Sequence, residues 1–314
     1  MPSRAALLSS DPTDLNAFYA KHPEFLICPL LIAAVLVYGC SCSSEMWGVG
    51  ALQYVGTSLL LQFALHGFVV CYQRELGKLQ PTPLVHSPAG VATRQSAVLL
   101  SNLVYMLLPM RPCSSSWASF AGWCVALALF WDAYFFVAHR EFHKRPKLYR
   151  LIHKRHHAIS DPMVFTAYYV EYISHFLTEQ LVVIAAAFIL PRDCLTSYLY
   201  FALVDTYLQH AGVDVDPIRL PLAPFLTVGH VRALLSLHSL PFGAYTTAHH
   251  DLHHEKNEKN YALAFTYLDR IAGTHHDGRT TTTASAAPAA PKAEPLAERT
   301  PMPPRLHSRQ LSGG

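Results

Sequence analysis

Charged residues are scarce in this chain of 314 residues, because Lys, Arg, Asp and Glu together make up only 14%. A soluble domain usually carries about a quarter charged residues. The deficit indicates that much of the surface faces something other than water. The net charge of +3 is small, and no basic stripe interleaved with aromatic residues occurs outside a histidine-rich region. We therefore expect a membrane protein with no nucleic-acid partner.

The seven cysteines form no CxxC pair, and most lie in or beside apolar runs. Free cysteine behaves as a small hydrophobic residue, so we expect structural cysteines in membrane helices rather than a disulfide framework. A signal peptide is also not apparent, because residues 1–24 are polar and the first apolar run starts at Phe25. We expect residues 1–24 to be a cytosolic N-terminal segment.

Apolar runs recur along the first two thirds of the chain. The longest uncharged run, 48–72, is long enough to cross a bilayer, since a spanning helix needs roughly 20 apolar residues. Shorter runs that span or enter the membrane, or pack in the core, occur at 25–40, 96–110, 117–138, 176–190 and 194–209. We predict an all-α fold: a polytopic membrane helical bundle with transmembrane helices in 25–124, followed by a catalytic domain over 125–275.

Positive charge predicts the orientation of these helices. Residues 139–157 contain seven Lys or Arg against one acid, and 73–94 contain three more. Cytosolic loops are enriched in such residues, so both segments are expected on the cytosolic side. From 279 onward the chain has six prolines and no aromatic residue. We predict a disordered tail over 276–314, since it cannot bury enough apolar area to fold.

Histidines are concentrated in short clusters. Of 19 histidines, nine lie in 139–157 and 249–254, in the motifs HREFH, HKRHH and HHDLHH. Spacings of three and four residues place imidazoles on one side of a helix, and neutral imidazole binds iron, zinc and copper. Eight such residues exceed the four to six ligands of one ion, so the sequence predicts two ions. Unmetallated, the same cluster would bury many imidazoles without partners.

The three motifs, with Asn260-Tyr261 and the segment Asp269-Arg270-Ile271-Ala272-Gly273-Thr274, resemble the fatty acid hydroxylase and sterol desaturase superfamily of membrane enzymes. The run LPFGAYTTAHHDLHH (240–254) looks most like its sterol 25-hydroxylase and methylsterol oxidase branch. The resemblance covers about 125–275. It departs from the family pattern at Leu268 and Ala272, where Trp and Phe are usual.

The resemblance implies a bundle of membrane helices with a cytosolic, histidine-rich cap that holds two iron ions, or zinc as isolated. It implies O2 as co-substrate, a lipid substrate, and electrons from a b-type cytochrome and an NAD(P)H-dependent reductase, in the endoplasmic reticulum. The metal ligands that it implies are His139, His143, His153, His156, His157, His210, His249, His250, His253 and His254. His230 and His238 lie between the last two motifs, and we favour polar loop roles for both.

Two acids are candidates for roles near the metal ions. Asp132 lies in an apolar run seven residues before His139, where an acid needs a partner. It could orient a ligand imidazole or bond to a neighbouring helix. Glu171 lies where the family often has a Glu after a Pro, but Val170 replaces that Pro.

The sequence favours oxidation of a sterol C–H bond. Hydroxylation or desaturation of a fatty acyl or sphingolipid chain is the alternative within the same enzyme class. A metal transporter or metal buffer is a distant alternative, because its ionisable residues would be spread along the spans rather than gathered at one side.

Overall fold

The computed structural model describes residues 56–57, 59–67, 69, 79, 112, 114–160, 162–220, 223–230 and 246–277. Several predicted features lie outside this part of the chain: the N-terminal segment 1–24, the apolar runs at 25–40 and 96–110, His238, and all of the predicted tail except residues 276 and 277.

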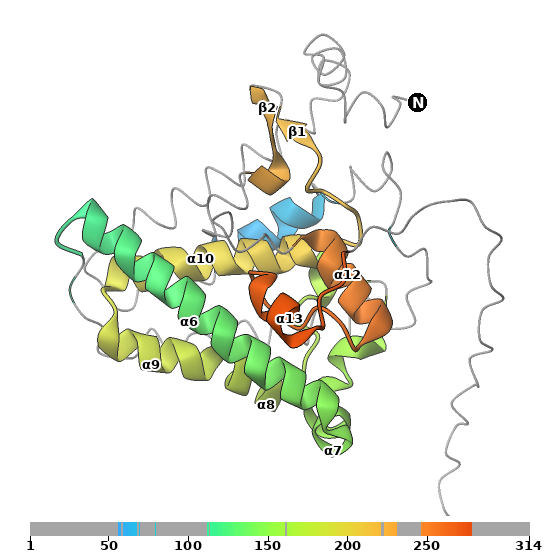
Figure 1. Ribbon diagram of the computed structural model, residues 1–314. Coiled ribbons are helices and arrows are strands. Elements are labelled where there is room, and N and C mark those ends of the chain that lie inside the picture. Colours follow the sequence, from blue (N-terminus) through green and yellow to red (C-terminus); the bar gives the residue numbers. More distant parts are fainter. Residues whose placement is uncertain are drawn as a thin grey trace, which may run out of the picture. The chain divides into compact units, whose positions relative to one another are not determined.

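The described part is mostly helical (Figure 1). Its α-helices are α6 (Trp117–Lys144), α7 (Pro146–Leu148), α8 (Tyr172–His175), α9 (Leu181–Ile189), α10 (Arg192–Gln209), α12 (Thr247–Lys256) and α13 (Tyr267–Ala272). Two π-helical turns, η2 (Tyr149–His153) and η5 (Phe176–Gln180), and two 3₁₀ turns, η3 (His156–Ala158) and η4 (Val164–Thr166), join them. A two-stranded antiparallel sheet, β1 (Arg219–Leu220) with β2 (Ala223–Thr227), departs from the all-α prediction.

The long helix α6 carries the first histidine motif on its last turns. The Ser116 hydroxyl caps its start by accepting a hydrogen bond from the Ser119 N–H at 3.2 Å. The helix ends at Lys144 because Arg145, which precedes a proline, takes an extended conformation. The apolar run predicted at 117–138 therefore continues as one helix through His139 and His143, as the motif spacing requires.

The predicted helical pair at 176–190 and 194–209 is present, with its break at Leu190 and Pro191. Helices α8 and α9 join through the π-helical turn η5 into one helical stretch, which packs against α6. The Trp131 indole N–H donates to the Thr178 carbonyl at 3.2 Å, and the Tyr134 hydroxyl donates to the Leu177 carbonyl at 2.5 Å. Both acceptors lie in η5, so α6 is fixed against this turn by hydrogen bonds as well as by apolar contacts.

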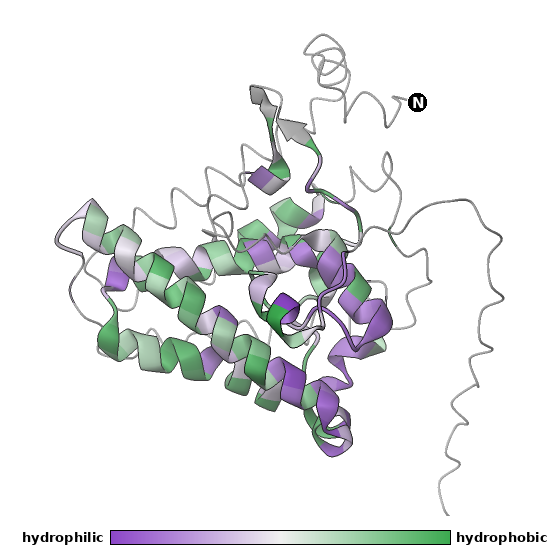
Figure 2. Ribbon diagram, viewed as in Figure 1, coloured by the Kyte–Doolittle hydropathy of each residue, from purple (hydrophilic) through white to green (hydrophobic). Residues whose placement is uncertain are grey.

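Polarity divides the described part along its helices. In Figure 2, apolar residues dominate α6 and α9, whereas α7 and α12 are largely hydrophilic. Two helical stretches, Trp117–Lys144 and Tyr172–Ile189, are long and apolar enough to cross a membrane. Large apolar side chains also remain exposed on them, including Phe130 at 58%, Val137 at 60% and Phe188 at 56%. This pattern suits helices that face lipid, and α6 carries the first histidine motif at its polar end.

Replacing Phe130 with Lys tests whether α6 faces lipid. Phe130 lies at the centre of the helix and is exposed, and a Lys at the middle of a spanning helix costs about 3 kcal/mol. We expect Phe130→Lys to lower the fraction of protein that resists alkaline extraction from membranes, whereas Phe130→Leu leaves it unchanged. Equal membrane retention of the Lys variant would show that this face contacts water.

Candidate metal centre

Nine of the ten predicted histidine ligands come together in two groups. Within each group the candidate ligand nitrogens all lie within 4.8 Å of one another, and every ring is buried except that of His143, which is half-buried. The five-histidine group contains His139, His143, His153, His157 and His253, and the four-histidine group contains His156, His210, His250 and His254. The structure therefore presents two separate sets of imidazoles, each of which could hold one metal ion.

The second and third histidine motifs each contribute to both groups. In the second motif, His153 and His157 join the five-histidine group while His156 joins the other. The chain makes this division by leaving the α-helix, because His153 ends a π-helical turn and His156 starts a 3₁₀ turn. In the third motif, α12 directs His253 to the five-histidine group and His250 and His254, one turn apart, to the four-histidine group.

The spacing of the Nε2 atoms fits a shared cation. In the five-histidine group, His139 lies 3.0 Å from His153 and 3.3 Å from His143, measured between Nε2 atoms. In the four-histidine group, His250 lies 3.0 Å from His210 and 3.1 Å from His254. Ligands that bind one ion at about 2.1 Å lie about 3.0 Å apart at right angles and about 3.4 Å apart in a tetrahedron. Both groups thus have the spacing of ligand sets.

Hydrogen bonds at the opposite ring nitrogen fix which nitrogen faces the centre of each group. The Nδ1 atoms of four rings face backbone carbonyls, which can only accept, so Nδ1 must carry the proton and Nε2 the lone pair. These bonds are His139 to Tyr261 (2.8 Å), His253 to Lys259 (2.7 Å), His210 to Thr206 (2.8 Å) and His254 to Ile159 (3.2 Å). Each group therefore contains at least two lone pairs aimed into the same small space, which a cation would stabilise.

Burial keeps these imidazoles neutral. It lowers the pKa of His156, His250 and His254 well below the usual value of 6.5, and neighbouring imidazoles lower it further. Burial also lowers the pKa of His210 to about 4. At neutral pH the rings are therefore unprotonated, which is the state that binds a metal.

His249 is the one predicted ligand that the structure does not bring to either group. It lies with His275 and Asp277, and the candidate ligand atoms of these three residues are within 4.8 Å of one another. Its Nδ1 atom, however, accepts the Thr246 N–H at 3.1 Å in the capping box of α12, so the proton of the neutral ring lies on Nε2. This tautomer has no lone pair at Nε2 for a metal. Adjacent residues on a helix point about 100° apart, which explains why His250 reaches the group and His249 does not.

Asp132 and Asp269 together hold five consecutive backbone N–H groups of the segment 261–265. Asp269 accepts from Tyr261 and Ala262, both at 2.9 Å, through its two oxygens. One oxygen of Asp132 accepts from the next three residues, Leu263 at 3.1 Å, Ala264 at 2.7 Å and Phe265 at 3.2 Å. Both carboxylates are fully buried. Asp132 thus binds this loop directly and bears on a ligand imidazole only through it.

The segment 261–265, called the clamped loop below because Asp132 and Asp269 hold it, and the residues just before it supply carbonyls that bind histidines of the five-histidine group. Tyr261 accepts from His139, and Lys259, two residues earlier, accepts from His253. Between them Asn260 has a left-handed φ of 55°, and its side chain donates to the carbonyls of His249 and His276. These carbonyls, and the role of Asp269, were missed by sequence reasoning. Asn260, Tyr261 and Asp269 belong to the segment that carries the family resemblance, which was the available signal.

The remaining candidates lie outside both groups. Glu171 forms an ion pair with Arg155, which lies between the histidines of the second motif. It therefore contacts the part of the chain that carries His153 and His156, and a role in the reaction stays a prediction. His230 is exposed and accepts a hydrogen bond from the Thr227 N–H at the start of a helical segment rather than in a loop.

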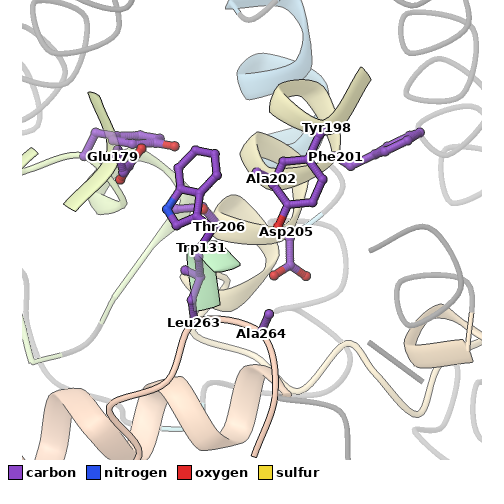
Figure 3. Close-up of a pocket in the computed structure, with 10 residues that line it drawn as sticks. Trp131, Glu179, Tyr198, Phe201, Ala202, Asp205, Thr206, Leu263 and Ala264 are labelled. Atoms are coloured by element: carbon purple, nitrogen blue, oxygen red, sulfur yellow. The ribbon is translucent and has the colours of Figure 1, made fainter. Parts of the chain in front are cut away.

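A small cavity lies between α6, η5, α10 and the clamped loop (Figure 3). Its volume is about 30 Å³, which is room for about one water molecule or a methyl-sized group. Trp131, Tyr198 and Phe201 contribute aromatic rings to its wall, and Glu179 and Asp205 contribute carboxylates. Thr206, whose carbonyl accepts from His210, also lines it. The cavity therefore lies one helical turn from a candidate ligand of the four-histidine group.

Comparison with known proteins shows what the segment that carries this site is similar to. Residues 124–274 match the fatty acid hydroxylase family model. This range contains all ten predicted histidines and both carboxylates of the loop clamp. This part of the chain is therefore similar to the fatty acid hydroxylase family, as its motifs suggested. No solved structure matches the chain.

The relatives include sterol-modifying and fatty-acid-modifying proteins. A cholesterol 25-hydroxylase-like protein of Danio rerio is 35% identical over 158 residues, covering 48% of this chain and 54% of the relative. Methylsterol monooxygenase 1 of Rattus norvegicus is 30% identical over 153 residues, covering 48% and 45%. Fatty acid hydroxylase ahd1 of Mycosarcoma maydis is 28% identical over 143 residues, covering 45% and 30%. The chain thus spans about half the length of the two sterol-related proteins.

Metal analysis of two adjacent histidine variants tests the two groups. We expect the purified protein to hold about two metal ions per chain, because each group offers enough imidazoles for one ion. His250→Ala should lower the content to about one, whereas His249→Ala, the matched control on the same helix, should keep both. Elemental analysis by mass spectrometry measures this. Equal loss in the two variants would contradict the separation of His249 from the ligand groups.

Two substitutions of Asp132 test the loop clamp. Asp132→Ala leaves three N–H groups without their acceptor, and each buried unsatisfied group costs about 1–3 kcal/mol. We expect its melting temperature to fall by several degrees and metal binding to weaken at the five-histidine group. Asp132→Asn keeps one acceptor oxygen and should recover part of both losses. An unchanged melting temperature for Asp132→Ala, measured by thermal denaturation in detergent, would contradict the clamp.

Proposed function

We propose that this protein is a membrane enzyme that uses two iron ions and O2 to oxidise a C–H bond of a lipid, and that this lipid is a sterol. The observation that carries the proposal is the pair of convergent imidazole groups at the polar end of two apolar helices. The similarity to the fatty acid hydroxylase family and the relatives named above support the same chemistry.

The two imidazole groups suit iron among the metals that imidazole binds. Iron bound there would supply the redox chemistry that reduces O2, so that R–H, O2, two electrons and two protons give R–OH and water. The chain's own contribution is to hold Nε2 lone pairs toward each centre by donating the Nδ1 protons of His139, His210, His253 and His254 to carbonyls. Deep burial of eight of the nine rings would keep bulk water from the reacting atoms.

A sterol is the proposed substrate because two of the relatives are named for cholesterol and methylsterols. The aromatic side chains of Trp131, Tyr198 and Phe201 in the wall of the small cavity would favour an apolar group there. A fatty acyl or sphingolipid chain, hydroxylated or desaturated, is the second candidate, and it is favoured by the relative named as a fatty acid hydroxylase.

The proposed location is the endoplasmic reticulum membrane with the metal centre facing the cytosol. Exposed cations surround the five-histidine group on the segment from α6 to η3, as the positive-inside rule requires of a cytosolic face. They are Lys144, Arg145, Lys147, Arg150 and Lys154. Such a surface would also attract an acidic electron carrier, which supports a b-type cytochrome and its NAD(P)H-dependent reductase as electron donors.

The apolar part of α6 argues against the alternative of a metal transporter. Asp132 is the only acidic or basic residue over 117–138 of this helix. Its Oδ1 atom accepts hydrogen bonds from three backbone N–H groups. The described histidine groups gather instead around the last turns of this helix. A transport path would need ionisable groups spaced along the span.

Turnover under ¹⁸O2 tests the proposed function. Membranes containing the full chain, NADPH and the electron donors should convert a sterol to an alcohol that carries one ¹⁸O atom, and His156→Ala should abolish the product. Lipid profiling by mass spectrometry with and without the protein identifies the substrate. Hydroxylated acyl chains would move the assignment to the second candidate. No labelled lipid from protein that holds two irons would overturn the proposal.

A further inference from the structure

Two buried thiols face each other where α6 packs against α10. The Sγ atoms of Cys124 and Cys194 lie 3.2 Å apart, although 70 residues separate them in sequence. Cys124 is 6% exposed and Cys194 is fully buried. The pair lies near the first turns of both helices, whereas the histidine groups lie at their last turns. It is therefore independent of the candidate metal centre.

Contacts on either side of the two thiols fix the register of the helices. Before α6, the N–H and hydroxyl of Ser114 donate to one oxygen of Asp193 at 2.9 and 3.1 Å. Further along the helices, the rings of Trp131 and Tyr198 lie 5.7 Å apart. The sulfur atoms are thus brought together by neighbouring interactions that do not involve sulfur.

We propose that Cys124 and Cys194 form a disulfide that joins α6 to α10. The sequence alone favoured structural thiols, because no cysteine spacing indicated this pair. A disulfide holds its sulfurs about 2.05 Å apart, so the two sulfur atoms must approach by about 1 Å to form the bond. The bond forms by thiol–disulfide exchange with a small-molecule or protein disulfide: two protein thiols are oxidised, and the exchanged disulfide is reduced to two thiols.

The proposed membrane topology places the two thiols toward an oxidising compartment. Helices α6 and α10 both run toward the histidine groups, so their first turns lie at the opposite end. If the histidines face the cytosol, the thiols lie toward the lumen, where disulfides form and persist during folding. The lumenal location of the thiols rests on the proposed function and its topology. The short distance between the two sulfur atoms does not depend on that proposal.

Such a disulfide would link two helices that each carry or position histidines of a different group. Helix α6 carries His139 and His143 of the five-histidine group, and α10 leads into His210 of the four-histidine group. The closed loop would also contain the whole of the first and second histidine motifs. A crosslink at this position restricts the unfolded chain over a long loop, so it should stabilise the frame that supports both groups.

Peptide mapping of the full chain tests the proposal directly. Cells are treated with N-ethylmaleimide before lysis, and the purified protein is denatured, alkylated again without reductant, digested and measured by mass spectrometry. We expect a linked pair of peptides containing Cys124 and Cys194, lacking two hydrogens and carrying no label. Alkylation of both residues, or linkage of either one to another cysteine, would overturn the proposal.

Variants test the consequence for stability. A reductant should lower the melting temperature of the native chain by several degrees. It should have no such effect on Cys124→Ser, Cys194→Ser or the double variant, which should melt alike. Cys71→Ser is the matched control and should keep the response to reductant. An equal response in all variants would overturn the proposal. Metal content and sterol turnover, measured on the same samples, report separately on the proposed function.

Discussion

The candidate metal centre depends on where each imidazole places its single proton. When Nδ1 donates to a backbone carbonyl, as in His139, His210, His253 and His254, the ring can neither turn nor change tautomer without losing that bond. Its lone pair is then directed inward at Nε2. Burial adds to this by keeping the rings neutral. The folded chain therefore concentrates unshared electron pairs in two places, and that is the arrangement a cation stabilises most.

The carbonyls can hold the rings only if their own segment is held. This is the physical role of the two buried acids, because Asp132 and Asp269 bind five successive N–H groups and so fix the loop that carries the Tyr261 carbonyl. A loop of buried, unpaired N–H groups is costly. Asp132 and Asp269 satisfy these groups, so support of the centre reaches from the middle of α6 to α13.

Much of this arrangement could be predicted from the sequence, because histidine spacing and apolar runs are local properties of the chain. The continuous helix through His139 and His143 and the break at Pro191 follow from such patterns, whereas His210 was a candidate ligand only through the family resemblance. The division of His153, His156 and His157 between two groups could not be predicted, since it depends on a π turn followed by a 3₁₀ turn. The pairing of Cys124 with Cys194 was equally inaccessible, because helix packing creates it.

One consequence of the third motif concerns metal exchange. Helix α12 presents His253 to one group and His250 and His254 to the other, so the separation of the two centres is set along a rigid helical backbone. The distance along α12 between these histidines thus limits how far apart the two groups can lie. An ion of different radius can alter the bond lengths around itself, but it cannot draw the two centres together without displacing α12 as a whole. Substitution of one metal for another should therefore leave the spacing between the two histidine groups unchanged.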